Sequence, residues 1–427
     1  MREKRLFYKP EDGVCGDFIP YYEDGWFYLY YLKDFRDIAN RGEGCPWYGL
    51  KSQDLVHWEE LGEMIPRGGS QEQDLFVYTG SVYHDVQKGG KYHIFYTGHN
   101  PYFVEQGKPQ EVILHAVSEN KTDWVKQKDC FYPAAGGYEC NDWRDPFVFW
   151  DETEGCYGMI LTARKKEGRE DQRGVSVLCH SDTLQEWRVT GNLWEPGKYV
   201  THECPDYFKL GDWWYLIYSE FSDCFQTHYV MAKSPRGPWI VPEDDVFDSR
   251  AYYAAKSVSD GQSRYLFGWL ATREGDCGQG NWQWGGSLVV HELYQREDGT
   301  LAVRMPGPIR EAVEKQRFPV LCRNEFVVEL DGRDGTACIL IPGNDACPEG
   351  YRLLFSVKEQ KMRVAFGNGE LLNSAFAGIE KAVELTPGKE HQVQLLLEGS
   401  CMVVYLDETY AMSARLYNRK LEEPTLI

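Results

Sequence analysis

Three acidic residues stand at the beginnings of strand-like segments that lie far apart in the sequence. Asp17 precedes FIPYYE, Asp145 precedes PFVFW, and Glu203 opens ECPDYFKL. Hydrolysis of a glycosidic bond needs two carboxyl groups beside the anomeric carbon, one to protonate the leaving oxygen and one to attack or to activate water. Most of the 66 acidic residues are expected to be solvated surface charges. An acid directly before an apolar, aromatic strand is instead expected to face a buried channel.

Acids so far apart act together only if the strands that carry them converge. Five units repeat one pattern, in which a strand-like segment, a turn and a strand rich in Tyr and Phe follow one another. Turn signals such as Glu23-Asp24-Gly25 and Lys88-Gly89-Gly90 separate the paired strands, as hairpins require. The pairs are GDFIPYYE with WFYLYYL, TGSVYHD with YHIFYTG, RDPFVFW with YGMILTA, ECPDYFKL with WWYLIYS, and AAKSVSD with RYLFGWL.

A second motif, a Ser followed by a polar run and a Trp, recurs out of phase with these pairs. Its four copies are SQDLVHW from Ser52, SENKTDW from Ser118, SDTLQEW from Ser181 and SPRGPW from Ser234. Repeated short antiparallel strands with almost no helical periodicity predict propeller blades. The sequence therefore predicts a five-bladed β-propeller over residues 1–305, although an array of β-sandwiches stays open. In a propeller the innermost strands begin near one central channel, where a pocket is expected.

The pattern changes after residue 305. Residues 306–320 contain PGPIREAVEKQRF, a charged stretch of mildly helical character, and are expected to be a linker. Residues 321–427 hold about seven short alternating strands, which is typical of a β-sandwich. The predicted fold class is thus all-β, a five-bladed propeller followed by a C-terminal sandwich.

Composition limits the partners and the setting. A net charge of -20 disfavours nucleic acid and anionic membrane surfaces, so a small carbohydrate is the expected partner, with a homo-oligomer left open. The 13 cysteines include no CxxC pair or other metal-ligand spacing, and no metal is expected. The first residues lack an apolar signal-peptide core, which favours a reduced, cytoplasmic setting. Neither a phosphate-binding Gly-rich loop nor a dinucleotide fingerprint occurs, and no cofactor is expected.

The ordered motifs resemble glycoside hydrolase family 32, which includes invertases, levanases, inulinases and sucrose-6-phosphate hydrolases. The resemblance covers nearly the whole chain. It rests on WYGLKSQDLVHWEELG (47–62), YTGS (78–81), WRDPFVF (143–149), HECPDYF (202–208) and WGGSLVVHELYQREDGTLAVRMP (284–306). The fold that this family implies agrees with the number of blades predicted above.

The resemblance implies a role for each acid in the cleavage of fructofuranosyl bonds. Asp17 would be the nucleophile, Glu203 the general acid and then the base, and Asp145, with Arg144 beside it, would hold ring hydroxyls in the transition state. The implied mechanism is retaining, with the two carboxyl groups about 5–5.5 Å apart. Glu203 must start protonated, so burial or nearby carboxylates should raise its pKa, whereas Asp17 must stay ionised.

Further residues are expected to contact the sugar. Trp47, Tyr78 and Trp284 are expected to be aromatic walls of the pocket, and Ser81 and Arg144 are expected to bind substrate. Cys204, next to the acid, is not expected to be a nucleophile because no His partner is evident nearby.

One departure from the family keeps other functions open. The family's first motif reads Asn-Asp-Pro-Asn-Gly, whereas this chain has Cys15-Gly16-Asp17-Phe18-Ile19. The loss of both Asn residues leaves a related furanosidase possible, such as an inverting arabinofuranosidase with carboxyl groups about 6.5–9.5 Å apart. A sugar-binding propeller without catalysis is the second alternative, and the presence of all three acids argues against it.

Overall fold

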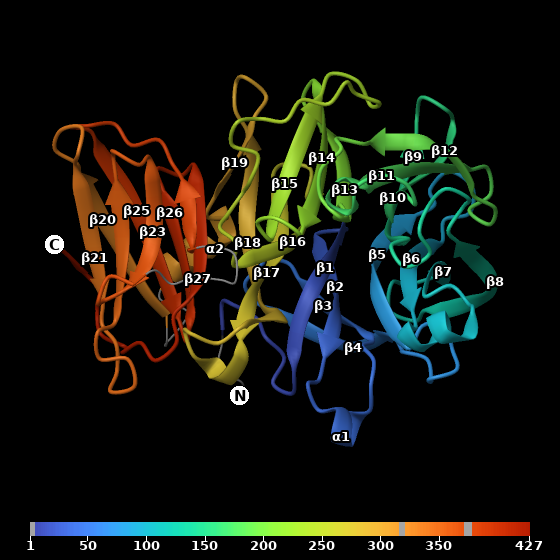
Figure 1. Cartoon of the computed structure of the whole chain (residues 1–427), viewed down its shortest axis with the longest axis horizontal. Helices are drawn as coiled ribbons and strands as arrows, with labels where there is room; N and C mark the ends of the chain where they lie inside the picture. Colours follow the sequence, from blue (N-terminus) through green and yellow to red (C-terminus); the bar gives the residue numbers. More distant parts are fainter. Residues whose placement is uncertain (1–4, 316–320, 371–377) are drawn as a thin grey trace.

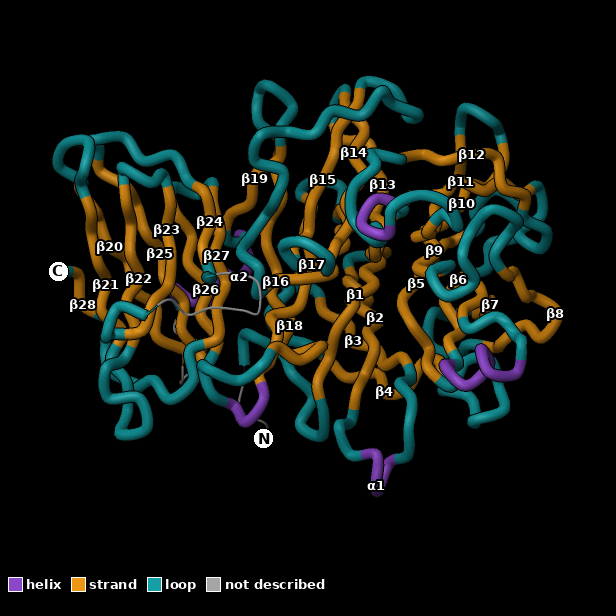
Figure 2. Tube along the Cα trace, in the orientation of Figure 1, coloured by secondary structure: helices purple, strands orange, loops and turns teal. Residues whose placement is uncertain are grey.

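The protein is built almost wholly of antiparallel strands, which confirms the predicted all-β class (Figures 1 and 2). The computed structural model describes residues 5–315, 321–370 and 378–427. Its two α-helices in those ranges are short, α1 (Ile38–Arg41) and α2 (Gly307–Glu314). No helix in the described part of the chain has the length and apolar character that crossing a membrane requires.

The strands before residue 305 form four sheets. One runs in the order β16-β17-β18-β1-β2-β3-β4, with β19 paired to β18, and the others are β5-β6-β7-β8, β12-β11-β10-β9 and β13-β14-β15. The strands are β1 (Val14–Glu23), β2 (Trp26–Asp34), β3 (Trp47–Ser52), β4 (Glu59–Ile65), β5 (Phe76–His84), β6 (Tyr92–His99), β7 (Glu111–Ser118), β8 (Val125–Pro133), β9 (Arg144–Asp151), β10 (Cys156–Arg164), β11 (Gly174–Ser181), β12 (Arg188–Trp194), β13 (Glu203–Leu210), β14 (Trp213–Glu220), β15 (Gln226–Ala232), β16 (Tyr252–Ser259), β17 (Arg264–Arg273), β18 (Trp282–Gln295) and β19 (Leu301–Arg304).

All five predicted strand pairs are confirmed as antiparallel hairpins: β1 with β2, β5 with β6, β9 with β10, β13 with β14, and β16 with β17. The first strands of these hairpins contact one another in a closed cycle. β1 contacts β5, β5 contacts β9, β9 contacts β13, β13 contacts β16, and β16 contacts β1. The eight-stranded sheet combines the first and last members of this cycle, because Cys15 of β1 pairs with Gly286 of β18.

The Ser-to-Trp motif is one turn used four times. The third residue after each Ser has a positive φ, 61° at Leu55, 71° at Lys121, 62° at Leu184 and 86° at Gly237. Each Ser hydroxyl accepts a hydrogen bond from the backbone N–H two residues later, the usual bond of a serine turn. Three copies join the third and fourth strands of a sheet, and the last follows β15. The repeat therefore marks the outer edge of each sheet.

Two further sheets follow α2 and pack as a β-sandwich. One has the order β20-β25-β26-β27 and the other β24-β23-β22-β21-β28, and their inner side chains belong to one apolar cluster. The seven predicted strands are present, and the sequence missed only the very short β24 and β28. The strands are β20 (Leu321–Glu329), β21 (Thr336–Ile341), β22 (Tyr351–Ser356), β23 (Lys361–Phe366), β24 (Glu380–Ala382), β25 (Glu390–Glu398), β26 (Cys401–Leu406), β27 (Tyr410–Arg415) and β28 (Thr425–Leu426).

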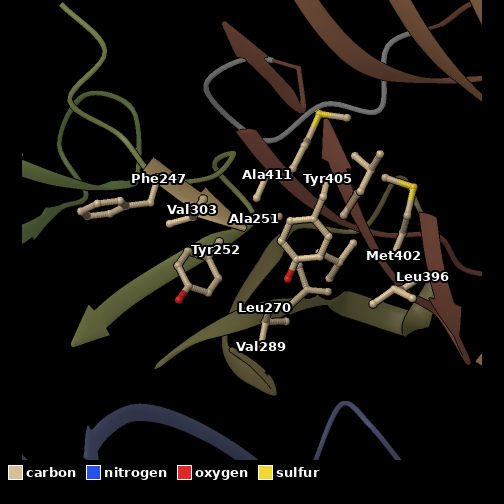
Figure 3. Packing of buried hydrophobic residues seen from close by; sticks show 14 of the residues in the cluster. Phe247, Ala251, Tyr252, Leu270, Val289, Val303, Leu396, Met402, Tyr405 and Ala411 are labelled. Carbon is tan, nitrogen blue, oxygen red and sulfur yellow. The ribbon is translucent and has the colours of Figure 1, made fainter. Parts of the chain in front are cut away.

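The expected linker contains α2, which spans Gly307–Glu314, while residues 316–320 of that prediction lie outside the described residues. Apolar packing joins the sandwich to the sheets before it. Figure 3 shows Tyr252, Leu270 and Val289 beside Met402, Tyr405 and Ala411 of the sandwich, and these residues belong to the same buried cluster. The two parts of the chain thus share one apolar core, in which single-residue changes are expected to affect both parts.

A buried polar cluster lies inside this apolar contact. Asp248 accepts hydrogen bonds from the Ser413 hydroxyl at 2.6 Å and the Ser413 N–H at 2.5 Å, and its Oδ2 lies 2.9 Å from Nε2 of His291. Nδ1 of His291 lies 2.9 Å from the Tyr405 hydroxyl. Burial by itself would raise the pKa of Asp248, but the hydrogen bonds from His291 and Ser413 hold it below its ordinary value. Asp248 therefore ties β18 and β27 to the segment before β16.

We expect Asp248→Asn to destabilise the protein by about 2–4 kcal/mol, because an amide leaves His291 or Ser413 without a buried acceptor. The measurement is the free energy of unfolding in urea. Asp334→Asn is the control, since the Asp334 side chain is 84% exposed and its ion pair with Lys358 spans 3.8 Å. Equal unfolding midpoints for the two variants would contradict the role given to Asp248.

Candidate active site

A cavity of about 640 Å³ opens where the first strands of the five hairpins converge. Its lining includes residues from β1, β5, β9, β13 and β16, together with the loop from β2 to β3. Six of the site residues expected from the sequence line this cavity: Asp17, Tyr78, Arg144, Asp145, Glu203 and Trp284.

A β-bulge in the first strand of each hairpin directs these side chains. Asp17, Asp145, Cys204 and Ala254 have φ values of 47°, 57°, 52° and 52°, in the left-handed region that non-glycine residues rarely adopt. At the same places the pairing register shifts between each first strand and its partner. A bulge inserts an unpaired residue and re-aims the neighbouring side chains. Carboxyl groups from three separate hairpins therefore face one space.

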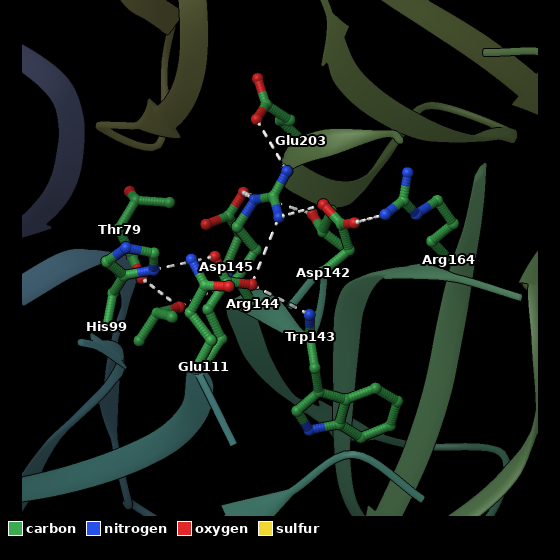
Figure 4. Close-up of polar contacts among 12 residues, drawn as sticks. Thr79, His99, Glu111, Asp142, Trp143, Arg144, Asp145, Arg164 and Glu203 are labelled. Carbon is green, nitrogen blue, oxygen red and sulfur yellow. Dashed lines mark hydrogen bonds and ion pairs between the residues drawn. The ribbon is translucent and has the colours of Figure 1, made fainter. Parts of the chain in front are cut away.

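The Arg144 guanidinium is the centre of the polar network in Figure 4. Its Nη1 donates to Asp142 at 2.6 Å and to Glu111 at 3.3 Å, and its Nη2 donates to Glu203 at 3.0 Å. Nε lies 3.9 Å from Oδ2 of Asp145. Arg144 is 8% exposed, so these carboxylates supply the charge compensation that a buried cation requires.

Glu203 is held at both oxygens. Oε1 accepts from Arg144, and Oε2 accepts from the Tyr253 hydroxyl at 2.6 Å. Burial raises the pKa of Glu203, Arg144 opposes this rise, and the charge of Asp145 adds to it. The direction is the one expected for a general acid.

Asp145 lies deeper and is fixed by the backbone. Its Oδ2 accepts from the N–H of Cys204 at 2.8 Å and from the Thr162 hydroxyl at 3.3 Å, and its own N–H donates to the Thr97 hydroxyl at 2.8 Å. Burial raises the pKa of Asp145 although Arg144 stabilises its charged form. This carboxyl is held rigidly and is suited to binding hydroxyl groups.

Asp17 accepts a hydrogen bond at Oδ1 from the Trp269 indole at 3.0 Å. Burial, followed by the charges of Asp145 and Glu203, raises the pKa of Asp17 to about 7, while Trp269 and Lys256 favour its ionised form. The direction of this shift runs against the expectation that Asp17 stays ionised. The cause is the close approach of three acids in a buried site.

Trp47 and Ser81, both expected to contact the sugar, do not line the cavity. The Trp47 side chain is fully buried in β3, and its indole donates to the Tyr78 carbonyl at 3.1 Å. The Ser81 hydroxyl accepts from the N–H of Val148 at 2.9 Å and joins β5 to β9. Both residues support the wall instead of forming it, because β3 is not an innermost strand and Ser81 lies beyond the bulge of β5.

Trp284 is 36% exposed at the mouth of the cavity, with its ring centroid 5.8 Å from that of Trp269. A Cβ on Gly16 would approach the Trp284 ring to 2.7 Å. Gly16 therefore leaves the space that this indole occupies. The aromatic ring is placed where a sugar face can stack on it.

Several lining residues were not expected from the sequence. Tyr253 precedes its bulge at the same offset as Arg144 and Glu203, so alignment of the five hairpins would have found it. Glu111 opens β7, and Phe221 and Phe225 lie after β14, where the strand pattern carries no signal. Burial raises the pKa of the Cys204 thiol well above its usual value, so it is unsuited to act as a nucleophile.

Comparison with known proteins agrees with this arrangement. The chain is 24% identical over 330 residues to a levanbiose-producing levanase of Bacillus subtilis (strain 168), covering 69% of this chain and 58% of the levanase. It is 29% identical over 265 residues to a sucrose-6-phosphate hydrolase of the same organism, covering 56% of this chain and 51% of the relative. The chain thus spans little more than half the length of these two relatives.

Among solved structures, sucrose-6-phosphate hydrolase from Lactobacillus gasseri superposes with a TM-score of 0.75 at 17% identity, covering 99% of this chain and 89% of the other. This likeness shows the fold. The sequence model of the glycosyl hydrolases family 32 N-terminal domain matches residues 10–302, which include all five hairpins and the cavity. The chain therefore belongs to glycosyl hydrolase family 32.

Proposed function

We propose that the protein is a retaining glycoside hydrolase that cleaves terminal fructofuranosyl bonds in sucrose or short fructo-oligosaccharides. One observation carries the proposal: Asp17, Asp145 and Glu203, which come from three different hairpins, line one cavity. The family membership and the printed names of the relatives, levanase and sucrose-6-phosphate hydrolase, support the fructosyl group as the substrate.

In the proposed first step Glu203 is protonated and Asp17 is ionised. Asp17 attacks C2 of the fructosyl group as the bond from C2 to the glycosidic oxygen breaks, and Glu203 gives its proton to that oxygen. In the second step a water molecule attacks C2 and gives a proton back to Glu203, and the ester bond to Asp17 breaks. Asp145 binds ring hydroxyls throughout.

The surrounding residues prepare these groups. Arg144 and Tyr253 fix the two oxygens of Glu203, so its carboxyl has one orientation in the cavity. The Trp269 N–H stabilises the charge that Asp17 needs for attack. Tyr78 and Trp284 supply apolar faces for the sugar, whereas Trp47 and Ser81 lie behind the lining and do not bind it.

For the fold we propose a five-bladed propeller. Division of the eight-stranded sheet at the pair of Cys15 and Gly286 gives β1–β4 and β16–β19 as two blades, and the other three sheets before residue 305 complete the ring. Residues 1–305 would be the catalytic domain and 321–427 the sandwich domain. The cytoplasmic location and the homo-oligomer remain predictions.

Asp17→Asn and Glu203→Gln are expected to lower kcat by roughly a thousandfold or more, because each removes a group that takes part directly in bond breaking. The measurement is fructose release from sucrose and from levan- and inulin-type oligosaccharides, with an aryl arabinofuranoside as the competing substrate. NMR of the first product should show the anomer of the substrate. Asp182→Asn, on an exposed turn, is the control and should retain full activity.

Release of arabinose alone would move the protein to the other class of furanosidase. Inversion at C2 would contradict Asp17 as the nucleophile. The third possible outcome is that no substrate is turned over and that Glu203→Gln does not change the affinity for sugar. The propeller would then be a sugar-binding protein without catalytic activity.

A second prediction concerns pH. Because Asp17 must be ionised and its pKa is raised to about 7, kcat/KM should fall as the pH drops through this value. Trp269→Phe removes a hydrogen bond to the charged form, so the pKa of Asp17 should rise and the acid limb should move up by about one pH unit. Trp124→Phe, on the turn between β7 and β8, also removes one indole hydrogen bond, the one to the Lys121 carbonyl, and should leave the limb in place. A shift in the opposite direction would exclude Asp17 as the group that titrates.

A further inference from the structure

The cavity of the proposed enzyme carries a large excess of negative charge. Besides the four acids described above (Asp17, Glu111, Asp145 and Glu203), three more line it: Asp34, Asp37 and Glu43. Two arginines, Arg36 and Arg144, are the cationic residues in its described lining. Even with Glu203 protonated for catalysis, carboxylates outnumber cations.

Of the three additional acids, Asp34 ends β2, and Asp37 and Glu43 belong to the loop between β2 and β3, which forms one side of the mouth. Asp37 caps α1, with its Oδ1 accepting from the Asn40 N–H at 3.2 Å. Glu43 accepts from the Tyr102 hydroxyl at 2.7 Å, which ties this loop to the 3-10 helix at Pro101–Gln106. Asp34 accepts from the N–H of Arg36 at 2.8 Å. These contacts hold the acids in fixed positions at the rim.

Both arginines of the lining are already engaged. Arg144 is bonded to Asp142, Glu111 and Glu203, as described above. Arg36 donates to the Thr272 hydroxyl at 3.0 Å and to Gln283 and the Trp284 carbonyl, so its guanidinium is turned toward β17 and β18. An anionic substrate could pair with the guanidinium of Arg36 or Arg144 only by breaking the hydrogen bonds that this guanidinium already makes.

Two cations behind the lining are engaged in the same way. Lys256, whose charge acts on Asp17, donates to the Gly80 carbonyl at 2.8 Å and is 2% exposed. Arg67 donates to the Gly44 carbonyl at 2.8 Å and also to the carbonyls of Arg41 and Gly42, and so supports the rim loop from beneath. Neither side chain is among the residues that line the cavity.

From this charge arrangement we infer that the site selects uncharged fructosides and excludes phosphorylated ones, with Asp37 and Glu43 as residues that determine this specificity. A phosphate monoester carries a charge of about -1.5 to -2 at neutral pH and would meet a lining rich in carboxylates, whose two arginines are already engaged. Like charges brought together in a partly desolvated site repel strongly. This inference rests on the proposed function and specifies its substrate class. It sets the chain apart from relatives named sucrose-6-phosphate hydrolases.

The test compares kcat/KM for sucrose and for sucrose-6-phosphate in the wild-type protein. Sucrose should be preferred by at least about tenfold at low ionic strength. The preference should shrink when the ionic strength is raised from about 0.01 M to about 1 M, which shortens the screening length from about 30 Å to about 3 Å. A preference for the phosphorylated sugar would overturn the inference, and so would a ratio that does not respond to salt.

The double variant Asp37→Asn/Glu43→Gln should raise the ratio of sucrose-6-phosphate to sucrose turnover several-fold. Asn still caps α1 and Gln still offers Tyr102 an acceptor, so charge is the main property that changes. The control is Asp334→Asn/Glu119→Gln, which neutralises two acids with side chains 84% and 74% exposed and should leave the ratio unchanged. An unchanged ratio in the rim variant would remove Asp37 and Glu43 from the argument.

Calorimetric titration of the Glu203→Gln variant, which is expected to turn over very slowly, with sucrose and with sucrose-6-phosphate separates this inference from the proposed function. If the wild-type protein hydrolyses no fructoside, the proposed function fails. Tighter binding of sucrose than of sucrose-6-phosphate would still support exclusion by charge. Equal or tighter binding of the phosphorylated sugar would overturn the inference.

Discussion

The burial of the Arg144 guanidinium among carboxyl groups is the interaction on which the arrangement of this molecule depends. Its partners come from β7, from the segment before β9 and from β13, so Arg144, itself on β9, links three separate sheets. A buried cation without partners is strongly unfavourable, and so are several carboxylates close together without a cation. The observed arrangement of the sheets meets both requirements. That arrangement also directs Glu203 into the cavity.

Much of the fold could be predicted because the strands have a strong local signal. Each of the five hairpins includes a strand rich in Tyr and Phe, turn signals such as Asp24-Gly25 and Gly89-Gly90 separate the paired strands, and the Ser-to-Trp turns mark the outer edges independently. The catalytic candidates could be found for a related reason. Asp17, Asp145 and Glu203 stand at the point where a polar residue interrupts an apolar strand, and such an interruption needs a chemical explanation.

What the sequence did not reveal depends on contacts between residues distant in the chain. Trp269 reads as one more aromatic residue of a buried strand, and only the fold places its N–H against Asp17. The sequence of β3 does not distinguish a pocket tryptophan from a core one, and the structure shows Trp47 buried in the core. The raised pKa of Asp17 likewise arises from burial in the assembled fold and from two acids more than a hundred residues away. Local periodicity contains no information about such encounters.

The bulges at the floor of the cavity set a limit on how far this protein could be stabilised. Left-handed backbone costs a residue with a Cβ about 1–2 kcal/mol. Of the four such residues at the bulges, Asp17, Asp145 and Cys204 line the cavity, and Ala254 directly follows the lining residue Tyr253. Glycine would relieve that cost at every one of these positions. At Asp17 and Asp145 it would also delete the carboxyl group, so selection for heat resistance and selection for turnover oppose each other there. At Ala254 the two kinds of selection do not oppose each other, because the Ala254 side chain has no catalytic group. Glycine at this position could therefore raise the thermal stability without loss of catalytic activity.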